Sequence, residues 1–318
     1  IVIAPATADF LARAATGQAD DLLAASLLAA ECPVLLVPAM NDHMWAHPQT
    51  QRNVAHVREL GYQVVDPDEG MLAAGEGSGP GRMPEPETIF AHVGRLLERG
   101  GGLHGRRVLV TAGPTREAID PVRFISNHSS GKMGVALAAA AWRRGASVDL
   151  IAGPLAVATP IGVTVHSVQS TADMAAAVER LLPESDVLVM AAAPADFRPS
   201  DPAASKIKKS SDPRAIALAP TQDILRSTQG ARRNGSVVVG FALETDDALA
   251  SGRRKLADKG LDMIVVNDAT EQGAGFGVDT NRVTLVMREG REEALPLMTK
   301  TDVADAILDR VEQLIRGR

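Results

Sequence analysis

The chain has 318 residues, 45% of them hydrophobic and 23% charged, a composition typical of a folded protein with one large domain or two. The formal net charge of -6 argues against a nucleic-acid-binding protein, because neutralising phosphates needs a basic face. No apolar run reaches the roughly 18 residues that span a membrane, so we expect no membrane partner. The single cysteine, Cys32, cannot form an internal disulfide, which suits a cytoplasmic protein.

Short β-branched runs alternate with Ala- and Leu-rich stretches, the pattern of a parallel α/β sheet. Aromatic residues make up only 3% of the chain, which also favours aliphatic cores between helices and parallel strands. The expected strands are Ile1–Ala4, Val34–Val37, Gln63–Val65, Arg107–Thr111, Ser147–Ile151, Val163–His166, Val187–Ala191, Ser236–Phe241, Met263–Val266 and Val283–Val286. The expected helices are Asp20–Ala30, Gln49–Leu60, Pro86–Arg99, Gly131–Arg144, Thr171–Leu182, Asp223–Ser227, Asp246–Lys259 and Lys300–Ile315.

Three consecutive glycines follow a predicted helix at Arg99 and indicate a helix end and a flexible joint. We therefore predict a domain at 1–99, a linker at 100–105 and a second domain at 106–318. The glycine-rich stretches Ala74–Gly81 and Gln272–Gly277 are predicted to be mobile loops. The chain begins without Met inside an apolar run, so we expect a fragment of a longer protein.

The segment Ser126–Gly134, SNHSSGKMG, joins a strand to a helix in the second domain. Its backbone N–H groups at a helix start and the helix dipole suit an anionic ligand. It matches neither GxGxxG nor a Walker loop. A serine that merely caps the helix is the alternative, but capping needs one serine and does not need Asn127 and His128 as well.

Two further polar groups follow buried strands of the same domain. Asp196 comes just after the run ending in Ala191-Ala192-Ala193, where open α/β sheets bind ligands, although an acidic helix cap is common there. Lys206, Lys208 and Lys209 could be a solvated surface, but beside a phosphate-binding helix they suggest a triphosphate clamp.

The ordered segments VTAGPTREAIDPVRFISNHSSGKMG, AAAPADFRP, KIKK, VGFALET, KLADKGLDMIVVND and GFGVDTN resemble phosphopantothenoylcysteine synthetase, the ligase half of the bifunctional flavoproteins of coenzyme A biosynthesis. The resemblance covers residues 105–318 and implies a Rossmann-like parallel-sheet ligase. Such an enzyme activates 4'-phosphopantothenate with CTP as an acyl-cytidylate, and cysteine then displaces CMP to form an amide. It is dimeric and uses Mg²⁺ or Mn²⁺ with CTP.

Carried over residue by residue, the resemblance makes Asn127 and Lys206 catalytic and gives Arg123 a contact with phosphopantothenate or the partner subunit. Asn127 would hold the acyl-cytidylate, Lys206 would stabilise charge on the triphosphate, and Asp196 would contact the nucleotide or its metal. His128 is treated as positional. The implied CTP-binding residues are Ala191, Ala192, Ala193, Asp196, Lys206, Gln222, Asp223, Ile224, Leu225, Phe241, Lys255 and Lys259.

The first domain contains APATAD, a strand running into a small-residue loop and a helix, and PAMNDHMW after a second strand. These resemble the decarboxylase half, a flavodoxin-like FMN protein of the homo-oligomeric, trimer-based cysteine decarboxylase family. The resemblance places Ala6 and Thr7 near the FMN. It makes Asn41 catalytic, binding the substrate carboxylate, with Met44 beside the substrate.

This half departs from the family in two ways. The family's flap carries a cysteine as proton donor, and Ala74 or Gly75 holds that place here. Cys32 precedes a strand and is read as a buried apolar thiol. The family's flavin-side histidine and the first strand would precede Ile1, so decarboxylation is doubtful for this fragment.

Two alternatives stay open. A Rossmann-type dinucleotide-binding oxidoreductase would need an acidic ribose ligand, for which Asp149 is the candidate. A non-catalytic scaffold is disfavoured in the second domain by Asn127, Asp196 and Lys206, but the altered flap leaves it open for the first.

Overall fold

The computed structural model describes residues 1–318 apart from 73–76, 99, 210–214, 245–246, 269–274 and 276. The chain separates into two compact units, Ile1–Arg99 and Gly100–Arg318. Over the described ranges we find no helix with both the length and the apolar character needed to cross a bilayer.

The first unit is built on a parallel sheet with the order β1-β2-β3. Successive residues of β2 face opposite sides, as the pleat requires. Leu36 joins the core formed with α1, α2 and α4, whereas Leu35 and Val37 pack with Leu96 of α5. The elements are β1 (Val2–Ala6), α1 (Ala8–Thr16), α2 (Leu22–Leu28), β2 (Leu35–Pro38), α3 (Asp42–Ala46), α4 (Pro48–Glu59), β3 (Gln63–Val64), the hairpin β4 (Asp68–Met71) and β5 (Ser78–Arg82), and α5 (Pro86–Leu97).

The second unit is built on an eight-stranded sheet with the order β10-β9-β6-β11-β14-β15-β17-β18. Neighbours from β10 to β15 are parallel, and β17 and β18 add antiparallel strands at one edge. The strands are β6 (Arg107–Ala112), β9 (Ser147–Ala152), β10 (Thr164–Ser167), β11 (Val187–Met190), β14 (Val237–Glu244), β15 (Met263–Asp268), β17 (Thr284–Met287) and β18 (Glu292–Ala294).

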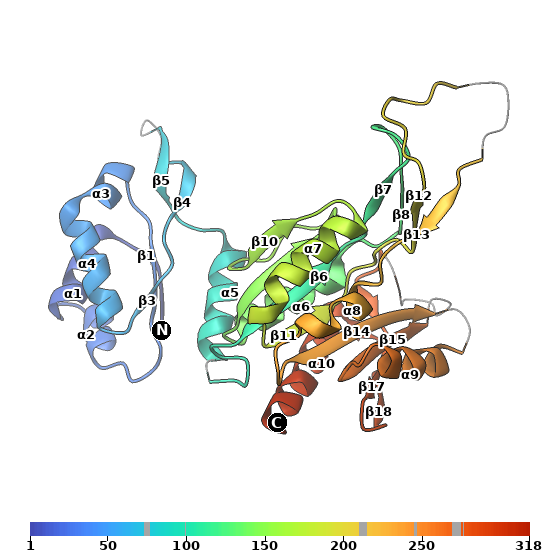
Figure 1. Ribbon diagram of the computed structural model, residues 1–318. Coiled ribbons are helices and arrows are strands. Elements are labelled where there is room, and N and C mark those ends of the chain that lie inside the picture. Colours follow the sequence, from blue (N-terminus) through green and yellow to red (C-terminus); the bar gives the residue numbers. More distant parts are fainter. Residues whose placement is uncertain (73–76, 99, 210–214, 245–246, 269–274, 276) are drawn as a thin grey trace. The chain divides into compact units, whose positions relative to one another are not determined.

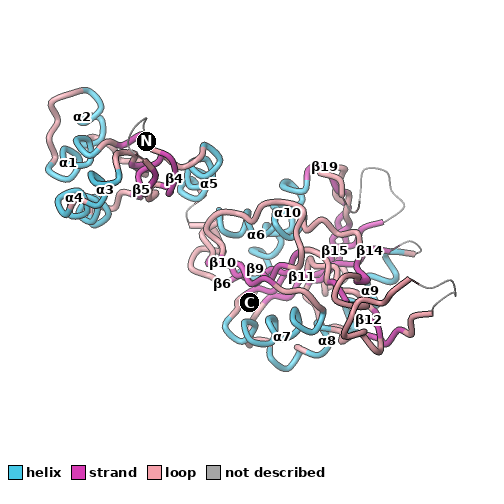
Figure 2. The backbone as a smooth tube through the Cα atoms, turned by 90° about the horizontal axis from the view of Figure 1, so that it is seen from above, coloured by secondary structure: helices cyan, strands magenta, loops and turns pink. Residues whose placement is uncertain are grey.

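Helices cover both faces of this sheet (Figure 2). The helices α6 (Lys132–Arg143) and α10 (Lys300–Arg316) pack against each other on one face, and α7 (Thr171–Leu181), α8 (Ile224–Ser227) and α9 (Ala248–Asp258) share a core with the other. The chain enters the sheet at β6, fills one side with β9 and β10, and then returns to fill the other side from β11. The carboxyl ends of β6 and β11 therefore border a topological switch point, where open α/β sheets bind ligands.

Two antiparallel hairpins project from the sheet (Figure 1). They are β7 (Arg116–Ala118) with β8 (Phe124–Ser126), and β12 (Phe197–Pro199) with β13 (Leu218–Pro220). We call their described residues, 116–126 and 197–220, the arm. A further short ladder pairs β16 (Thr280–Asn281) with β19 (Met298–Thr299).

The predicted fold class is confirmed, and every predicted helix and strand has a counterpart whose ends differ by a few residues. The segment Ser126–Gly134 joins β8, which ends at Ser126, to α6, which begins at Lys132, one residue after the predicted helix start. Two predictions were wrong in detail. Cys32 is exposed instead of buried, because it lies before the strand begins.

The glycine-rich stretch Ala74–Gly81 is not wholly a loop, because its end forms β5. Its residues Ala74 and Gly75 lie outside the described residues, as does most of Gln272–Gly277.

Candidate active site

The helix α6 begins at the switch point without a side-chain cap. Its N-cap is Gly131, whose φ of 80° lies in the left-handed region, and no side-chain hydrogen bond caps the helix. Ser129 instead accepts a long hydrogen bond from the Gly131 N–H at 3.4 Å. The reading of these serines as ordinary helix caps is therefore wrong, and the helix directs uncapped N–H groups toward whatever lies in front of it.

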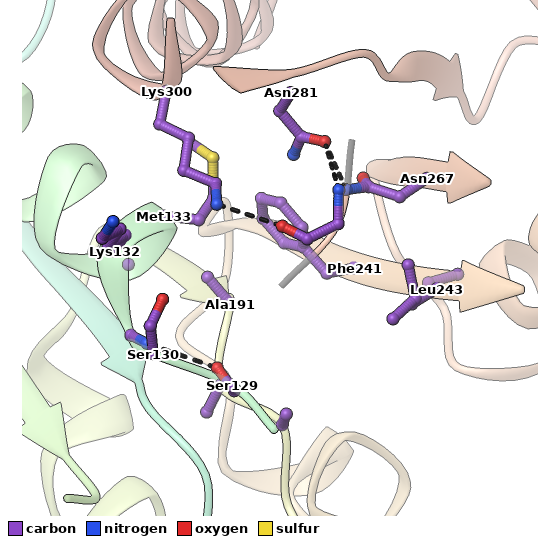
Figure 3. A pocket seen from close by; sticks show the side chains of 16 residues that line it. Ser129, Ser130, Lys132, Met133, Ala191, Phe241, Leu243, Asn267, Asn281 and Lys300 are labelled. Atoms are coloured by element: carbon purple, nitrogen blue, oxygen red, sulfur yellow. Dashed lines mark hydrogen bonds between the residues drawn. The ribbon is translucent and has the colours of Figure 1, made fainter. Parts of the chain in front are cut away.

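A cavity, here cavity A, opens in front of this helix end (Figure 3). Its apolar part includes Met133, Leu243 and the predicted residues Ala191 and Phe241. Its polar part consists of Ser129, Ser130, Lys132, Asn267, Asn281 and Lys300. The cavity thus offers hydroxyl, amide and ammonium groups around an apolar lining.

Two lysines give cavity A its positive charge. Lys132 pairs with Asp279 at 2.6 Å, and the Lys300 ammonium donates to the carbonyl of Gly275 at 3.1 Å. Lys300 is only 7% exposed, and its burial together with the nearby Lys132 lowers its pKa. An anion entering cavity A would offset the repulsion between the two ammonium groups.

An amide pair forms another part of the cavity wall. The Asn267 Nδ2 donates to the Asn281 Oδ1 at 2.9 Å (Figure 3). Within the described part of the chain, the buried Asn267 Oδ1 has no hydrogen-bond partner. An unsatisfied buried acceptor is costly, so this oxygen suits a ligand that donates an N–H or O–H.

A second cavity, here cavity B, lies beside the first at the carboxyl ends of β11 and β14. Within cavity B, the Lys259 ammonium is ion-paired with the Asp223 carboxylate at 3.0 Å. The cavity brings together nine of the residues predicted to bind CTP, namely Ala192, Asp196, Gln222, Asp223, Ile224, Leu225, Phe241, Lys255 and Lys259.

Cavities A and B share two lining residues, Ala192 and Phe241. Asn127 lies outside both linings and is fastened where they meet. Its Nδ2 donates to the carbonyl of Ala193, which lines cavity A, at 3.0 Å, and to that of Pro194, which lines cavity B, at 3.1 Å. Asn127 is therefore held at the boundary between the two cavities.

Arg123 and Lys206 lie on the arm and not in the lining of either cavity. Asp120, which sequence reasoning missed, organises this part of the arm. Its carboxylate accepts from the Arg123 side chain and from the backbone N–H of Ile207 at 3.1 Å, and Arg123 donates to the Ile207 carbonyl at 2.9 Å. These bonds hold the polypeptide next to Lys206 against the turn that carries Arg123.

Gln222–Leu225 lie at the start of α8 and line cavity B, so their predicted role in cradling phosphates stays a prediction. The helix α8 has only four residues and its dipole is small, and the side chains of Ile224 and Leu225 are buried, so these two residues would offer their backbone. Over the described ranges no cluster of three or more His, Cys, Asp or Glu side chains could hold a metal on its own. The carboxylates of Asp196 and Asp223 in cavity B could hold a cation together with a phosphorylated ligand.

Asp149, the ribose ligand required by the dinucleotide alternative, is engaged elsewhere. It is buried inside β9 and accepts from Arg107 at 2.9 Å, and its other oxygen pairs with His166 at 2.7 Å. Because both carboxylate oxygens are engaged and the side chain is buried, Asp149 is not free to bind a ribose. This argues against the dinucleotide-binding oxidoreductase.

In the first unit, Thr7 and Asn41 follow the neighbouring parallel strands β1 and β2 at the same sheet edge. The Thr7 hydroxyl accepts from the Phe10 N–H at 3.1 Å and caps α1, whereas Ala6 is fully buried and can offer only its backbone. Asn41 caps α3 through its Oδ1, and Met44 is exposed.

The β4–β5 hairpin lies against the Asn41 segment. Met40 N–H donates to the Gly81 carbonyl at 3.0 Å, and a Cβ on Gly81 would lie 2.1 Å from the Met40 carbonyl oxygen. Only glycine permits this approach, so the hairpin base is fitted to the segment that carries Asn41.

Comparison with known proteins agrees with this two-unit organisation. Residues 103–315 match the family described as the DNA/pantothenate metabolism flavoprotein C-terminal domain, and residues 1–98 match the flavoprotein family. The coenzyme A biosynthesis bifunctional protein CoaBC of Mycobacterium bovis is 49% identical over all of this chain and 79% of its own length. The protein of the same name from Bacillus subtilis is 46% identical over 99% of this chain and 78% of its own.

A solved structure agrees as well. The crystal structure of the C-terminal domain of a coenzyme A biosynthesis bifunctional protein CoaBC matches 69% of this chain and 100% of its own, with a TM-score of 0.59 and 39% identity. The chain therefore belongs to the CoaBC family, the bifunctional enzymes of coenzyme A biosynthesis that combine phosphopantothenoylcysteine synthetase and decarboxylase activities.

Proposed function

We propose that the second unit joins 4'-phosphopantothenate to cysteine using CTP, with the acid in cavity A and the nucleotide in cavity B. The observation that carries the proposal is the meeting of two chemically different cavities at Ala192 and Phe241. The ammonium groups of Lys132 and Lys300, together with the apolar lining of cavity A, suit an acid with a phosphorylated end. The lysines and carboxylates of cavity B suit a triphosphate bound with a divalent cation.

In the proposed reaction a carboxylate oxygen of the acid attacks the α-phosphorus of CTP, and pyrophosphate leaves. The cysteine amine then attacks the acyl carbon, and CMP leaves as the amide forms. Mg²⁺ or Mn²⁺ arriving with CTP would neutralise the triphosphate. We assign Asp196 to that metal because it is an exposed carboxylate in the lining of cavity B.

We assign Asn127 to the acyl-cytidylate because it is fastened at the boundary of the two cavities. Lys206 is proposed to stabilise negative charge on the triphosphate, and Arg123 to contact phosphopantothenate or a partner subunit. The bonds between Asp120, Arg123 and Ile207 support a common role for these two cations, because they hold both in one part of the arm.

The arm also supports the proposal that the second unit forms a dimer through it. Val122, Phe124, Phe197 and Leu218 are 47–57% exposed, and their apolar side chains all belong to the arm. A second copy of this chain is the proposed partner, since its arm would bury the same apolar groups and bring further residues to the site. Sedimentation of the chain as a monomer at micromolar concentration would contradict this.

For the first unit we propose FMN as the flavin and a trimer-based assembly. Backbone N–H groups at Ala6 and Thr7 before α1 would bind the FMN phosphate, and Asn41 and Met44 would contact the substrate. FMN would supply reversible oxidation of the substrate thiol, which allows carbon dioxide to leave. The fit of the hairpin base against Met40 supports a flap over this segment. A chain that retains no flavin absorbance after incubation with FMN would refute this assignment.

The ligase proposal is tested with the purified chain by measuring pyrophosphate release. We expect release from CTP only when 4'-phosphopantothenate is present, because the carboxylate is the attacking group. Release from ATP but not CTP, or none from CTP, would overturn the nucleotide assignment.

Asn127→Asp separates the two steps. In a single turnover we expect pyrophosphate release within about tenfold of wild type and loss of amide formation. Aspartate cannot donate the two hydrogen bonds that hold Asn127 at Ala193 and Pro194, so the acyl-cytidylate, once formed, would not be held for the cysteine amine. Asn234→Asp, at an exposed position away from both cavities, is the matched control. Equal loss of both steps would refute the role given to Asn127.

A further inference from the structure

Arg232 lies between α8 and β14, outside the linings of cavities A and B, and is half-buried. Its guanidinium donates three hydrogen bonds, all to backbone carbonyls. Its Nη2 donates to the carbonyls of Leu225 at 2.7 Å and Lys259 at 3.0 Å, and its Nη1 donates to the carbonyl of Gly260 at 2.8 Å. A planar guanidinium can serve several acceptors at once in a fixed geometry, which a lysine ammonium cannot reproduce.

The acceptors belong to two elements, α8 and the end of α9, each of which contributes residues to cavity B. Leu225 lies in α8, and Lys259 is the C-cap of α9, so each offers a carbonyl at or near a helix end that lacks a helical partner. Both residues line cavity B. One side chain therefore joins two walls of the cavity from the side facing away from the ligand.

A second link joins the same walls from inside the cavity. The Lys259 ammonium pairs with Asp223, the N-cap of α8, at 3.0 Å. A phosphate bound in cavity B competes with Asp223 for this ammonium and weakens the inner link. The outer link through Arg232 is made by carbonyls that no nucleotide displaces, so it continues to fix the spacing of Leu225 and Lys259.

The environment of Arg232 is energetically unfavourable for a guanidinium, which indicates a role other than packing. Its Nε is buried and, among the described residues, has no hydrogen-bond partner. Desolvation also lowers the pKa of the guanidinium. A partly desolvated charge of this kind is a poor source of stability, whereas the three carbonyl bonds specify one geometry.

We propose that Arg232 is a positioning residue for the nucleotide, holding Leu225 and Lys259 at the spacing that cavity B needs once the ligand has engaged Lys259. The inference rests on the proposed assignment of CTP to cavity B. It predicts a defect specific to the nucleotide, because no bond of Arg232 reaches a residue that lines cavity A alone.

Arg288 provides a matched control. It donates to the same Gly260 carbonyl at 2.9 Å and to the Leu261 carbonyl at 2.8 Å, and it pairs with Asp262 at 3.2 Å. It thus caps the end of α9 as Arg232 does but does not bond to Leu225 or Lys259. Arg288→Met tests the general loss of an arginine cap at this helix end.

The experiment measures steady-state pyrophosphate release by the full chain while CTP or 4'-phosphopantothenate is varied in turn. For Arg232→Met we expect the KM for CTP to rise about tenfold and the KM for 4'-phosphopantothenate to change by less than about twofold. Arg232→Lys should recover part of the loss, because an ammonium can serve some of the three carbonyls. Arg288→Met should leave both KM values within about twofold of wild type.

Equal rises in both KM values, or the same CTP defect in Arg288→Met, would overturn the inference. If Arg232→Met folds poorly, the thermal shift that CTP produces in Arg232→Lys gives the second measurement, and an undiminished shift would also overturn it. Failure of the proposed function has a different signature, because the wild-type chain itself would then release no pyrophosphate from CTP.

Discussion

Asp120 is the residue on which the arm's polar contacts converge. One carboxylate oxygen accepts from the backbone N–H groups of Val122 and Arg123, both at 2.8 Å, and the other accepts from the Arg123 side chain and Ile207 N–H. The Arg123 guanidinium, followed by these backbone bonds, holds the pKa of Asp120 well below its usual range. Since the pKa of Asp120 is depressed in the folded state, its ionised carboxylate contributes fully to the free energy of unfolding at pH values above its unfolded-state pKa. This contribution is lost as the pH falls through the folded-state pKa.

This sign gives a prediction for Asp120→Asn. We expect the melting temperature of the variant to lie below that of wild type by a constant amount between pH 8 and pH 5. The difference should narrow only below about pH 4, near the unfolded pKa of aspartate. Asp201→Asn, an exposed position on the same arm, should show little difference at any pH. A difference that vanished between pH 7 and pH 5 would contradict the depressed pKa.

Residues of cavity B could be named from the sequence because they stand in segments that resemble the ligase family. Asp196 was indicated also by its place just after a buried strand. The residues on the far wall of cavity A were not predicted. Asn267, Asn281 and Lys300 are single polar residues on β15, β16 and α10, and only the packing of these elements brings them together. Two signals were present. Asn267 and Asn281 stand in the family-like segments KLADKGLDMIVVND and GFGVDTN, and Asn267 directly follows the apolar run Met263–Val266, in the same strand-end setting that drew attention to Asp196.

Among the elements, the contact of α6 with β6 decides where the uncapped helix end lies. Gly134 permits that contact, because a Cβ at this position would lie 2.5 Å from the Ala112 Cβ and 2.8 Å from the Thr111 carbonyl oxygen. These neighbours belong to the sheet and cannot rotate away. The helix would have to shift, and with it Ser129, Ser130 and Lys132.

We therefore expect Gly134→Ala to destabilise the second unit by about 1–3 kcal/mol, despite the higher helix propensity of alanine. Urea unfolding measures this loss. Gly230→Ala is the control, because a Cβ there meets nothing within 4 Å and the backbone φ is not positive. A Gly134→Ala variant as stable as wild type would show that the helix tolerates displacement from the sheet.

The central strands and helices could be predicted because burial imposes a period on their apolar residues. The hairpins of the arm could not be predicted in this way. Their strands contain a proline or lie within two or three residues of one, and they carry exposed apolar side chains. Phe197–Pro199 and Leu218–Pro220 illustrate this, as each ends in proline and, among the described residues, is paired with the other strand alone. Their strand conformation follows from tertiary placement and not from local pattern.

At the scale of the whole molecule, the two units have separate hydrophobic cores. Leu36 and its neighbours form the core of the first unit with α1, α2 and α4, whereas Leu188 and its neighbours form a core of the second with α7, α8 and α9. Each core is made only of residues from its own unit, Ile1–Arg99 or Gly100–Arg318. Separate cores allow separate cooperative unfolding.

We therefore predict two thermal transitions in calorimetry of the full chain. The second unit has the larger core and should account for the larger enthalpy, since unfolding enthalpy scales with the number of residues ordered. CTP with 4'-phosphopantothenate should raise only that transition, and Gly134→Ala should lower only that transition, because ligand and substitution both act within 100–318. FMN should raise only the midpoint temperature of the transition that belongs to the first unit. A single transition that moved as a whole with each of these changes would show that the two units unfold as one and would contradict the predicted boundary near residues 100–105.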